Sequence, residues 1–184
     1  MRLVDERSIA GIRADRLWAV YERAFDDLRE VAVQRHAFTR DEFDAVLADE
    51  RVIKFVVSDP ARRDVVCGVA TLTNDLAAVP LVSPEYFANR WPDRFSSRQI
   101  WYVGFLAVDP DYQGTGAIAQ LIGRMCAEAA ATGGVIAADI CEFNEQSMRL
   151  PSAFARLART FSPGIRQQRL DAQVYWAYEF PEPA

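Results

Sequence analysis

A strand, a tight glycine turn and a helix follow one another without interruption over residues 101–132, and this stretch constrains the fold most. Residues 101–108 (WYVGFLAV) form a continuous apolar run, which is typical of a strand buried on both faces. A turn is expected at 109–111 (DPD), because proline presets φ and the aspartates can bond their own backbone. Apolar residues then recur at helical spacing over 118–129. The glycines of 113–116 (QGTG) therefore lie at the N-terminus of a helix.

Such a helix N-terminus attracts anions. Its first four N–H groups lack an internal partner, and the helix dipole places partial positive charge there. Gly114 and Gly116 lack the Cβ atoms that would keep a phosphate away from the backbone. We therefore expect the turn to bind a pyrophosphate through backbone amides. The alternative is a tight glycine turn that binds nothing.

The stretch LAVDPDYQGTGAIAQLI resembles motif A of the GNAT superfamily of acyl-CoA-dependent N-acyltransferases. That motif is an apolar strand, then V-x-P, then Q/R-x-x-G-x-G/A at the start of a helix. Ile118 takes the place of the last Gly/Ala, which is compatible with the motif if its side chain points into the core while its N–H stays available. Four positions match directly: Val108, Pro110, Gln113 and Gly116.

The remaining patterns predict an α/β (α+β) protein. Helices are predicted over 17–28, after a capping box formed by Thr39 and Glu42, after Ser83, and from Asn144 as N-cap, with a break near Leu150 before Pro151. The two strands joined by the central helix are expected to be parallel, whereas the other strands are expected to pair antiparallel. In addition to 101–108, strands are predicted at residues 3–4, 52–57, 65–73, 135–141 and 174–180.

This order of elements resembles the GNAT fold over nearly the whole chain. The resemblance implies a single domain over residues 1–184, with a mixed, mostly antiparallel sheet flanked by helices. It also implies that the central parallel strands splay apart around an acyl-CoA site. The long connection at 76–98 is not explained by the resemblance: its aromatic residues could line an acceptor pocket, form a dimer contact or pack a small satellite core.

The resemblance also assigns the residues that hold acetyl-CoA. The pantetheine arm is expected to bond the backbone of the central strand like an added β-strand. One of these amides, assigned to Leu106, would face the thioester carbonyl and stabilise the oxyanion that develops when an amine attacks. Asn144 could equally be an N-cap and nothing more. The residues predicted to bind acetyl-CoA are Leu106, Ala107, Val108, Gln113, Gly114, Thr115, Gly116, Ala117, Ile118, Asn144 and Ser147.

The catalytic side chains are less well defined by the sequence. The family often places a glutamate on the central strand, and here Tyr102 occupies that position. Glu142 is the alternative proton acceptor, while the alternation of the strand suggests a different face for Asp139. Residues 148–159 lack the tyrosine that often serves as general acid, so Tyr175 or solvent would serve, or the step needs no acid.

These residues predict an N-acetyltransferase that moves an acetyl group from acetyl-CoA to a primary amine by direct attack in a ternary complex. Two alternatives stay open at this stage. The missing glutamate and tyrosine would suit a catalytically idle acyl-CoA-binding or sensor domain. A structural dimerising domain with an empty turn is the other alternative, and the intact Gln113 and Gly116 count against it.

Composition limits the partners. A net charge of −5 and a pI near 5.0 argue against a nucleic-acid or membrane binder and favour a small-molecule or peptide amine as acceptor, with a homodimer possible. Neither a membrane-spanning stretch nor a signal-peptide pattern is found, so a cytoplasmic protein is expected. With one histidine, His36, no metal site is expected, and the three cysteines are expected to be buried free thiols. The abundance of arginine and alanine suggests a bacterial source.

Overall fold

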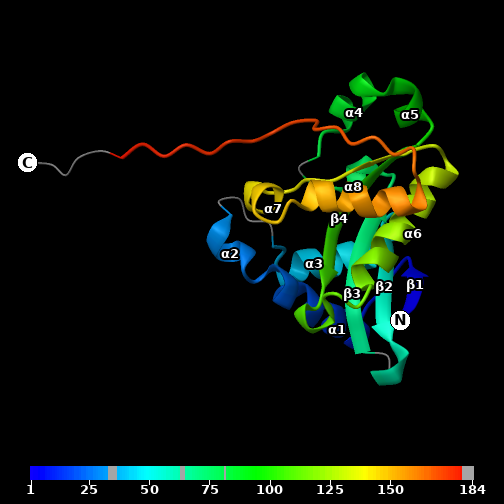
Figure 1. Cartoon of the computed structure of the whole chain (residues 1–184), viewed down its shortest axis with the longest axis vertical. Coiled ribbons are helices and arrows are strands. Elements are labelled where there is room, and N and C mark those ends of the chain that lie inside the picture. Colours follow the sequence, from blue (N-terminus) through cyan, green and yellow to red (C-terminus); the bar gives the residue numbers. More distant parts are fainter. Residues whose placement is uncertain (33–36, 63–64, 81, 180–184) are drawn as a thin grey trace, which may run out of the picture.

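The computed structural model describes residues 1–32, 37–62, 65–80 and 82–179 and places one five-stranded sheet at the centre of the molecule (Figure 1). Neighbouring strands are antiparallel except for the last pair, β4 and β5, which is parallel. This confirms the predicted mixed, mostly antiparallel sheet. The strands, in their order across the sheet, are β1 (Arg2–Glu6), β2 (Ile53–Asp59), β3 (Val65–Thr73), β4 (Ile100–Val108) and β5 (Val135–Ala137).

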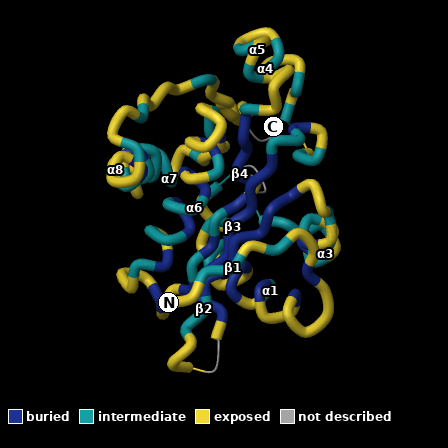
Figure 2. The backbone as a smooth tube through the Cα atoms, turned by 90° about the vertical axis from the view of Figure 1, so that its right-hand side faces the viewer, coloured by how far each residue is buried: buried dark blue, intermediate teal, exposed yellow. Residues whose placement is uncertain are grey.

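Helices cover both faces of the sheet. On one face α6 (Ala117–Ala131) and α8 (Leu150–Phe161) bury their apolar side chains against β2, β3 and β4. On the other face α1 (Ile12–Phe25) and α3 (Arg40–Ala48) do the same. Figure 2 shows the buried strands between these two helical layers. The described chain also contains the shorter helices α2 (Leu28–Val31), α4 (Pro84–Arg90), α5 (Pro92–Ser96) and α7 (Glu142–Gln146).

Local sequence rules explain most of these elements. Thr39 accepts the N–H of Glu42 while the Glu42 carboxylate accepts the N–H of Thr39, which confirms the predicted capping box at the start of α3. Ser83 accepts the N–H of Tyr86 and starts α4 in the same way. The break near Pro151 is also confirmed, because α7 ends at Gln146 and α8 starts at Leu150.

The strand predicted at 135–141 is shorter in the structure. Its last residue paired with β4 is Ala137, which lies opposite Tyr102. Ala138, Asp139 and Ile140 are exposed, so no neighbouring layer buries their side chains and holds them in the sheet. The apolar pattern alone could not show this end, since it continues for several residues past the last pairing partner.

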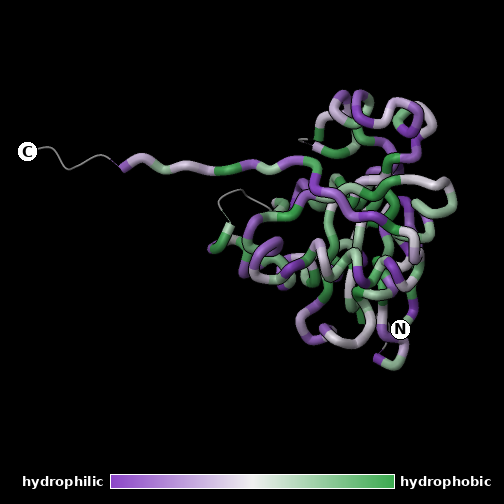
Figure 3. Tube along the Cα trace, turned by 45° about the horizontal axis from the view of Figure 1, so that its top comes forward, coloured by the Kyte–Doolittle hydropathy of each residue, from purple (hydrophilic) through white to green (hydrophobic). Residues whose placement is uncertain are grey.

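The C-terminal strand predicted at 174–180 is absent over its described part. After a turn at residues 163–164 the chain still crosses the body, where Ile165 and Leu170 pack against the core and the Leu170 carbonyl accepts the Tyr86 hydroxyl. Residues 171–179 belong to no strand, and they run away from the body of the molecule (Figures 1 and 3). The predicted apolar face is solvent-exposed, with Val174 at 68%, Trp176 at 79% and Tyr178 at 79%. Phe180 lies outside the described residues. Alternation predicts a strand only where a neighbouring strand supplies hydrogen-bond partners, and here none lies alongside.

One smaller prediction was also wrong. Cys141 is the N-cap residue of α7, and Asn144 lies within that helix instead of capping it. In the insertion, α4 ends at Arg90, and Pro92 starts α5 at the first helical position. The insertion packs as a satellite core, in which Leu76 and Phe87 contact the end of the sheet at Ile100, Tyr102 and Ala137.

Within the described residues, no helix has both the length and the apolar character needed to cross a membrane.

Candidate active site

The site is built around a gap at the edge of β4. Strands β4 and β5 pair only at Ile100 with Val135, Trp101 with Ile136, and Tyr102 with Ala137. Beyond this point β4 continues to Val108, while the chain after Ala137 leaves the sheet. On the β5 side, the edge of β4 over residues 103–108 therefore pairs with no strand of the described chain.

Backbone alternation shows which groups of β4 face this gap. The N–H of Asp109 donates to the Cys67 carbonyl at 2.9 Å, so Asp109 is directed toward β3. Because successive residues of a strand alternate, Ala107 also faces β3, whereas Leu106 and Val108 present their N–H and C=O groups to the gap. The N–H of Phe105 donates to Thr71 Oγ1 at 3.1 Å, in agreement with this alternation.

The gap ends at the glycine turn. Gly114 and Gly116 have φ of +75° and +90°, and no heavy atom lies within 4 Å of the position that a Cβ would occupy on either residue. Gly116 is the N-cap of α6, and its carbonyl accepts the N–H of Gln120 at 3.1 Å. The amides of Ala117 and Ile118 precede this first helical bond, so they have no acceptor within the helix.

The other residues of the turn have different surroundings. Thr115 donates both its N–H and its hydroxyl to the Tyr112 carbonyl, at 3.3 and 2.6 Å, so it stabilises the turn itself. Gln113 is exposed beside the glycines. The side chain of Ile118 is 40% exposed, and the expectation that it points into the core was therefore wrong. Its amide remains at the first turn of α6.

A guanidinium from α1 holds this turn. Arg23 donates to both carboxylate oxygens of Asp109, at 3.0 and 2.8 Å, and to Asp111 at 3.1 Å. The hydrogen bond to Asp111 and the charge of Asp109 raise the pKa of Arg23. Asp109 also accepts the N–H of Asp111 at 2.9 Å, as expected of an aspartate at a turn. The single positive charge of Arg23 therefore offsets part of the negative charge of the two aspartates in this turn.

On the opposite end of the gap, the phenol of Tyr102 donates to Asp139 Oδ1 at 2.8 Å. Tyr102 is 7% exposed, and its burial together with the neighbouring Asp139 carboxylate raises the pKa of the phenol. Glu142 does not contact this pair. It is exposed on the first turn of α7, where its Oε1 accepts the side-chain N–H of Gln146 at 2.6 Å.

The sequence of residues 17–154 matches the acetyltransferase (GNAT) family. The chain belongs to this family. Its members are acyl-CoA-dependent acetyltransferases, and an open-edged central strand followed by a glycine turn is the arrangement that the motif A resemblance implies. None of the curated proteins matches the sequence.

Solved structures of the same fold agree with the family. The tetramutant of the BH1408 protein from Bacillus halodurans has a TM-score of 0.54 at 16% identity, covering 96% of this chain and 100% of that chain. The ribosomal-protein-S18-alanine N-acetyltransferase from Escherichia coli has a TM-score of 0.52 at 15% identity, covering 83% and 76%. An aminoglycoside acetyltransferase from an uncultured soil metagenomic sample has a TM-score of 0.51 at 16% identity, covering 96% and 97%.

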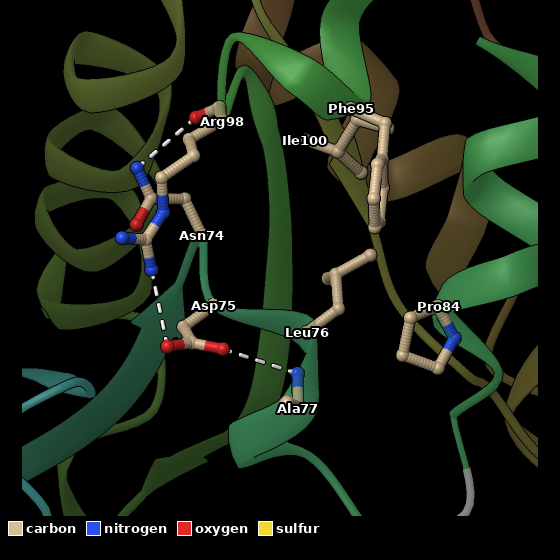
Figure 4. Close-up of a pocket in the computed structure, with 8 residues that line it drawn as sticks. All are labelled: Asn74, Asp75, Leu76, Ala77, Pro84, Phe95, Arg98 and Ile100. Atoms are coloured by element: carbon tan, nitrogen blue, oxygen red, sulfur yellow. Dashed lines mark hydrogen bonds and ion pairs between the residues drawn. The ribbon is translucent and has the colours of Figure 1, made fainter. Parts of the chain in front are cut away.

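The insertion also forms a cavity, which lies at the start of β4. A cavity of about 260 Å³ opens between the 3₁₀ helix at Leu76–Ala78, the start of β4 and helices α4 and α5. Figure 4 shows Ile100 and Phe95 on its apolar side. On its polar side Arg98 pairs with Asp75 at 3.1 Å. Ile100 is shared with the satellite core around Tyr102, so the cavity adjoins that core.

The far side of the gap is formed by the chain after β5. Asn144 is half-buried within α7 and Ser147 is exposed at its C-cap, and their contact with acetyl-CoA stays a prediction. Tyr175 lies in the extended C-terminal segment at 46% exposure.

The described residues hold no group of three or more His, Cys, Asp or Glu side chains that could bind a metal ion, and His36 lies outside them. Cys67 and Cys126 are free and buried, as predicted, whereas Cys141 is free but only half-buried.

Sequence reasoning missed Arg23 and Asp139. Arg23 lies 86 residues before its partner Asp109, and no local pattern of α1 distinguishes it from other surface arginines. A signal for Asp139 did exist. Tyr102 and Ala137 are opposite each other in the parallel pair, and a strand continued past Ala137 would place the residue two positions later on the same face.

Proposed function

We propose that this protein transfers an acetyl group from acetyl-CoA to a primary amine, by direct attack within a ternary complex. The open edge of β4, which leads directly to the uncapped N-terminus of α6, is the observation that carries the proposal. It supplies two features that acetyl-CoA requires: free backbone groups along an extended arm, and free amides at a site of partial positive charge.

Specific residues fit each part of acetyl-CoA. The amides of Gly114, Gly116, Ala117 and Ile118 would hold the pyrophosphate, because both glycine positions leave open space and the first turn of α6 has unused donors. Leu106 and Val108 would bond the pantetheine arm through their backbones, with Ala107 packed beneath them. Bound acetyl-CoA supplies the activated acetyl group.

The remaining predicted contacts lie around this core of the site. Gln113 lies beside the pyrophosphate turn, Thr115 maintains its shape, and Asn144 with Ser147 would close the site from α7. The N–H of Leu106 would face the thioester carbonyl oxygen and stabilise negative charge as it develops there.

The acceptor would approach from the side of Tyr102. A net charge of −5 favours an amine, which is cationic in solution. The fold does not choose the amine, since neighbouring structures are named for a ribosomal-protein alanine and for aminoglycosides. A small-molecule or peptide amine in the cytoplasm, and a homodimeric enzyme, remain our predictions.

Turnover with a panel of amines tests this function. The purified protein is incubated with acetyl-CoA and mixtures of polyamines, amino acids, aminoglycosides and short peptides, and the products are identified by mass spectrometry. We expect at least one acetylated amine whose amount grows with enzyme concentration and matches the CoA released.

A protein that binds CoA but acetylates no member of the panel would favour the catalytically idle domain. The presence of Tyr102 in place of a glutamate is the observation that supports this second candidate. A protein that binds neither CoA nor acetyl-CoA would contradict both functions.

A further inference from the structure

Asp139 stands where the two parallel strands separate. Ala137 is the last residue of β5 paired with β4, and Asp139 follows it by two positions, with its carboxylate at the Tyr102 phenol. Asp139 is exposed, whereas its partner Tyr102 is almost fully buried. The pair therefore joins the interior of the sheet to the entrance of the gap.

The contact between them fixes one side of the carboxylate. Tyr102 donates its only proton to Asp139 Oδ1 at 2.8 Å. The ring of Tyr102 is itself held edge-on by Phe87 from α4, with ring centroids 6.4 Å apart. No hydrogen bond to Oδ2 is formed by any residue that the structure describes, so this oxygen can accept a proton or a hydrogen bond from a ligand.

We propose that Asp139 binds the attacking amine and accepts a proton from it, and that Tyr102 is the positioning residue that orients the carboxylate. This inference rests on the proposed function and adds a residue to it. It also names the acceptor class, an amine that is protonated in solution and enters beside the end of β5.

The reaction balances as follows. The ammonium first loses one proton to solvent, and the free nitrogen then forms a bond to the thioester carbonyl carbon. The carbon–sulfur bond breaks, and its electron pair leaves with sulfur as the thiolate of CoA, which takes a proton from solvent. The attacking nitrogen gives its second surplus proton to Asp139, which releases it to solvent. One proton is released overall for each amide formed.

Neither of the other candidate side chains suits this role as well. The raised pKa of Tyr102 keeps the phenol protonated at neutral pH, so it donates to Asp139 and cannot act as the proton acceptor. Glu142 lies three residues further on, at the exposed start of α7, and its Oε1 is bonded to Gln146. Of these three side chains, Asp139 is the one that is exposed to solvent and also hydrogen-bonded to a buried residue of the sheet.

The test compares the Asp→Asn change at Asp139 with the same change at a control aspartate, Asp93. Asp139→Asn retains a carbonyl oxygen that can accept the Tyr102 proton, so we expect the fold and the CoA affinity to stay as in the wild type. We expect its kcat to fall about a hundredfold, the usual contribution of a positioned proton acceptor. Asp139→Glu should recover part of this loss. Asp93→Asn, the same change in the first turn of α5, should leave kcat unchanged.

Single and double variants of Tyr102 and Asp139 distinguish a positioning role of Tyr102 from a packing role. Tyr102→Phe should lower kcat less than Asp139→Asn does, and adding it to Asp139→Asn should cause no further loss of kcat, because Tyr102 acts through the carboxylate. A further independent loss in the double variant would overturn the positioning role of Tyr102.

A binding experiment keeps failure of this inference distinct from failure of the proposed function. The affinity of spermidine for the CoA-bound protein is measured by calorimetry, with no turnover required. We expect Asp139→Asn to weaken it about tenfold, as for loss of one charge-assisted hydrogen bond, and Asp93→Asn to leave it unchanged. Wild-type kcat and amine affinity in Asp139→Asn, or a loss of kcat that appears in Glu142→Gln instead, would overturn the assignment.

Discussion

Lys54 is the only lysine of the chain and is fully buried in β2. Its ammonium donates to the carbonyls of Arg7 and Asp49, at 2.8 and 2.6 Å, and so joins the end of α3 to the segment after β1. Burial lowers the pKa of Lys54 to about 8, although the nearby Asp49 carboxylate acts in the opposite direction. A neutral amine still has two N–H donors for the two carbonyls.

This lowered pKa predicts a stability that depends on pH. In the unfolded chain the pKa of lysine is about 10.4, so between pH 8 and 10.4 the unfolded state binds more protons than the folded state. The free energy of unfolding should therefore rise with pH in this window. Relative to Lys54→Met, which lacks the titration, the wild type should gain up to about 2 kcal/mol between pH 7.5 and 9.5. Urea unfolding at each pH measures this difference, and a constant difference would contradict the lowered pKa.

Gly116 allows a sharper test of the pyrophosphate turn. A valine there places a branched Cβ on the open side of the turn at a φ of +90°, so we expect CoA affinity to fall at least tenfold, about 1.4 kcal/mol. Gly133→Val is the matched control, because Gly133 has a φ of +63° and similarly open surroundings at the far end of α6. Both variants should lose stability, but only Gly116→Val should lose CoA affinity, as measured by calorimetry. Equal CoA affinities for the two variants would place the phosphate elsewhere.

At the scale of elements, the sequence predicts well what local chemistry determines. The capping box of α3, the hairpin of β2 and β3, and the glycine start of α6 each depend on residues a few positions apart. The parallel pair also followed from its connecting helix. The ends of elements were harder to predict. Strand β5 ends where it separates from β4, and an apolar pattern does not show where a strand loses its partner.

The same reasoning explains which parts of the site were missed. Amides of the turn could be inferred because the motif that forms them is continuous. Arg23 and Asp109 are 86 residues apart, and no local pattern indicates that they meet. Tyr102 and Asp139 are 37 residues apart, and their contact can be inferred only once the register of β4 and β5 is known. The exposed C-terminal segment shows the opposite error. Its apolar and polar residues alternate clearly, but the described chain places no strand beside it.

The C-terminal segment can be tested through Trp176. At 79% exposure it should emit at long wavelength and be quenched by iodide more strongly than Trp18 and Trp91, which are partly buried, or Trp101, which is 7% exposed. Trp176→Phe should therefore remove most of the iodide-accessible emission and leave the melting temperature unchanged. If the lost emission is instead protected from iodide and the melting temperature falls, the segment packs against the sheet as its alternation predicts.

At the scale of the whole molecule, the sheet separates two tasks. The face under α6 and α8 carries the large apolar core, and α6 begins at the glycine turn. Helices α1 and α3 cover the opposite face, from which Arg23 holds that turn, and the insertion packs around Tyr102. The gap, which is the edge of β4 that β5 leaves unpaired, lies between the two faces of the sheet. An acyl donor held at one end of this gap and an amine at the other would meet at the middle of β4.

Thermal unfolding with acetyl-CoA tests this account most directly. A ligand present at one hundred times its Kd stabilises the folded state by about 2.7 kcal/mol, and each kcal/mol raises the melting temperature of a domain of this size by about 2–4 °C. We therefore predict a rise of about 5–10 °C with saturating acetyl-CoA or CoA, which is smaller in Gly116→Val at the same concentration. A wild-type melting temperature that does not change at millimolar concentrations of both compounds would contradict the proposed acetyl-CoA site, and with it the function.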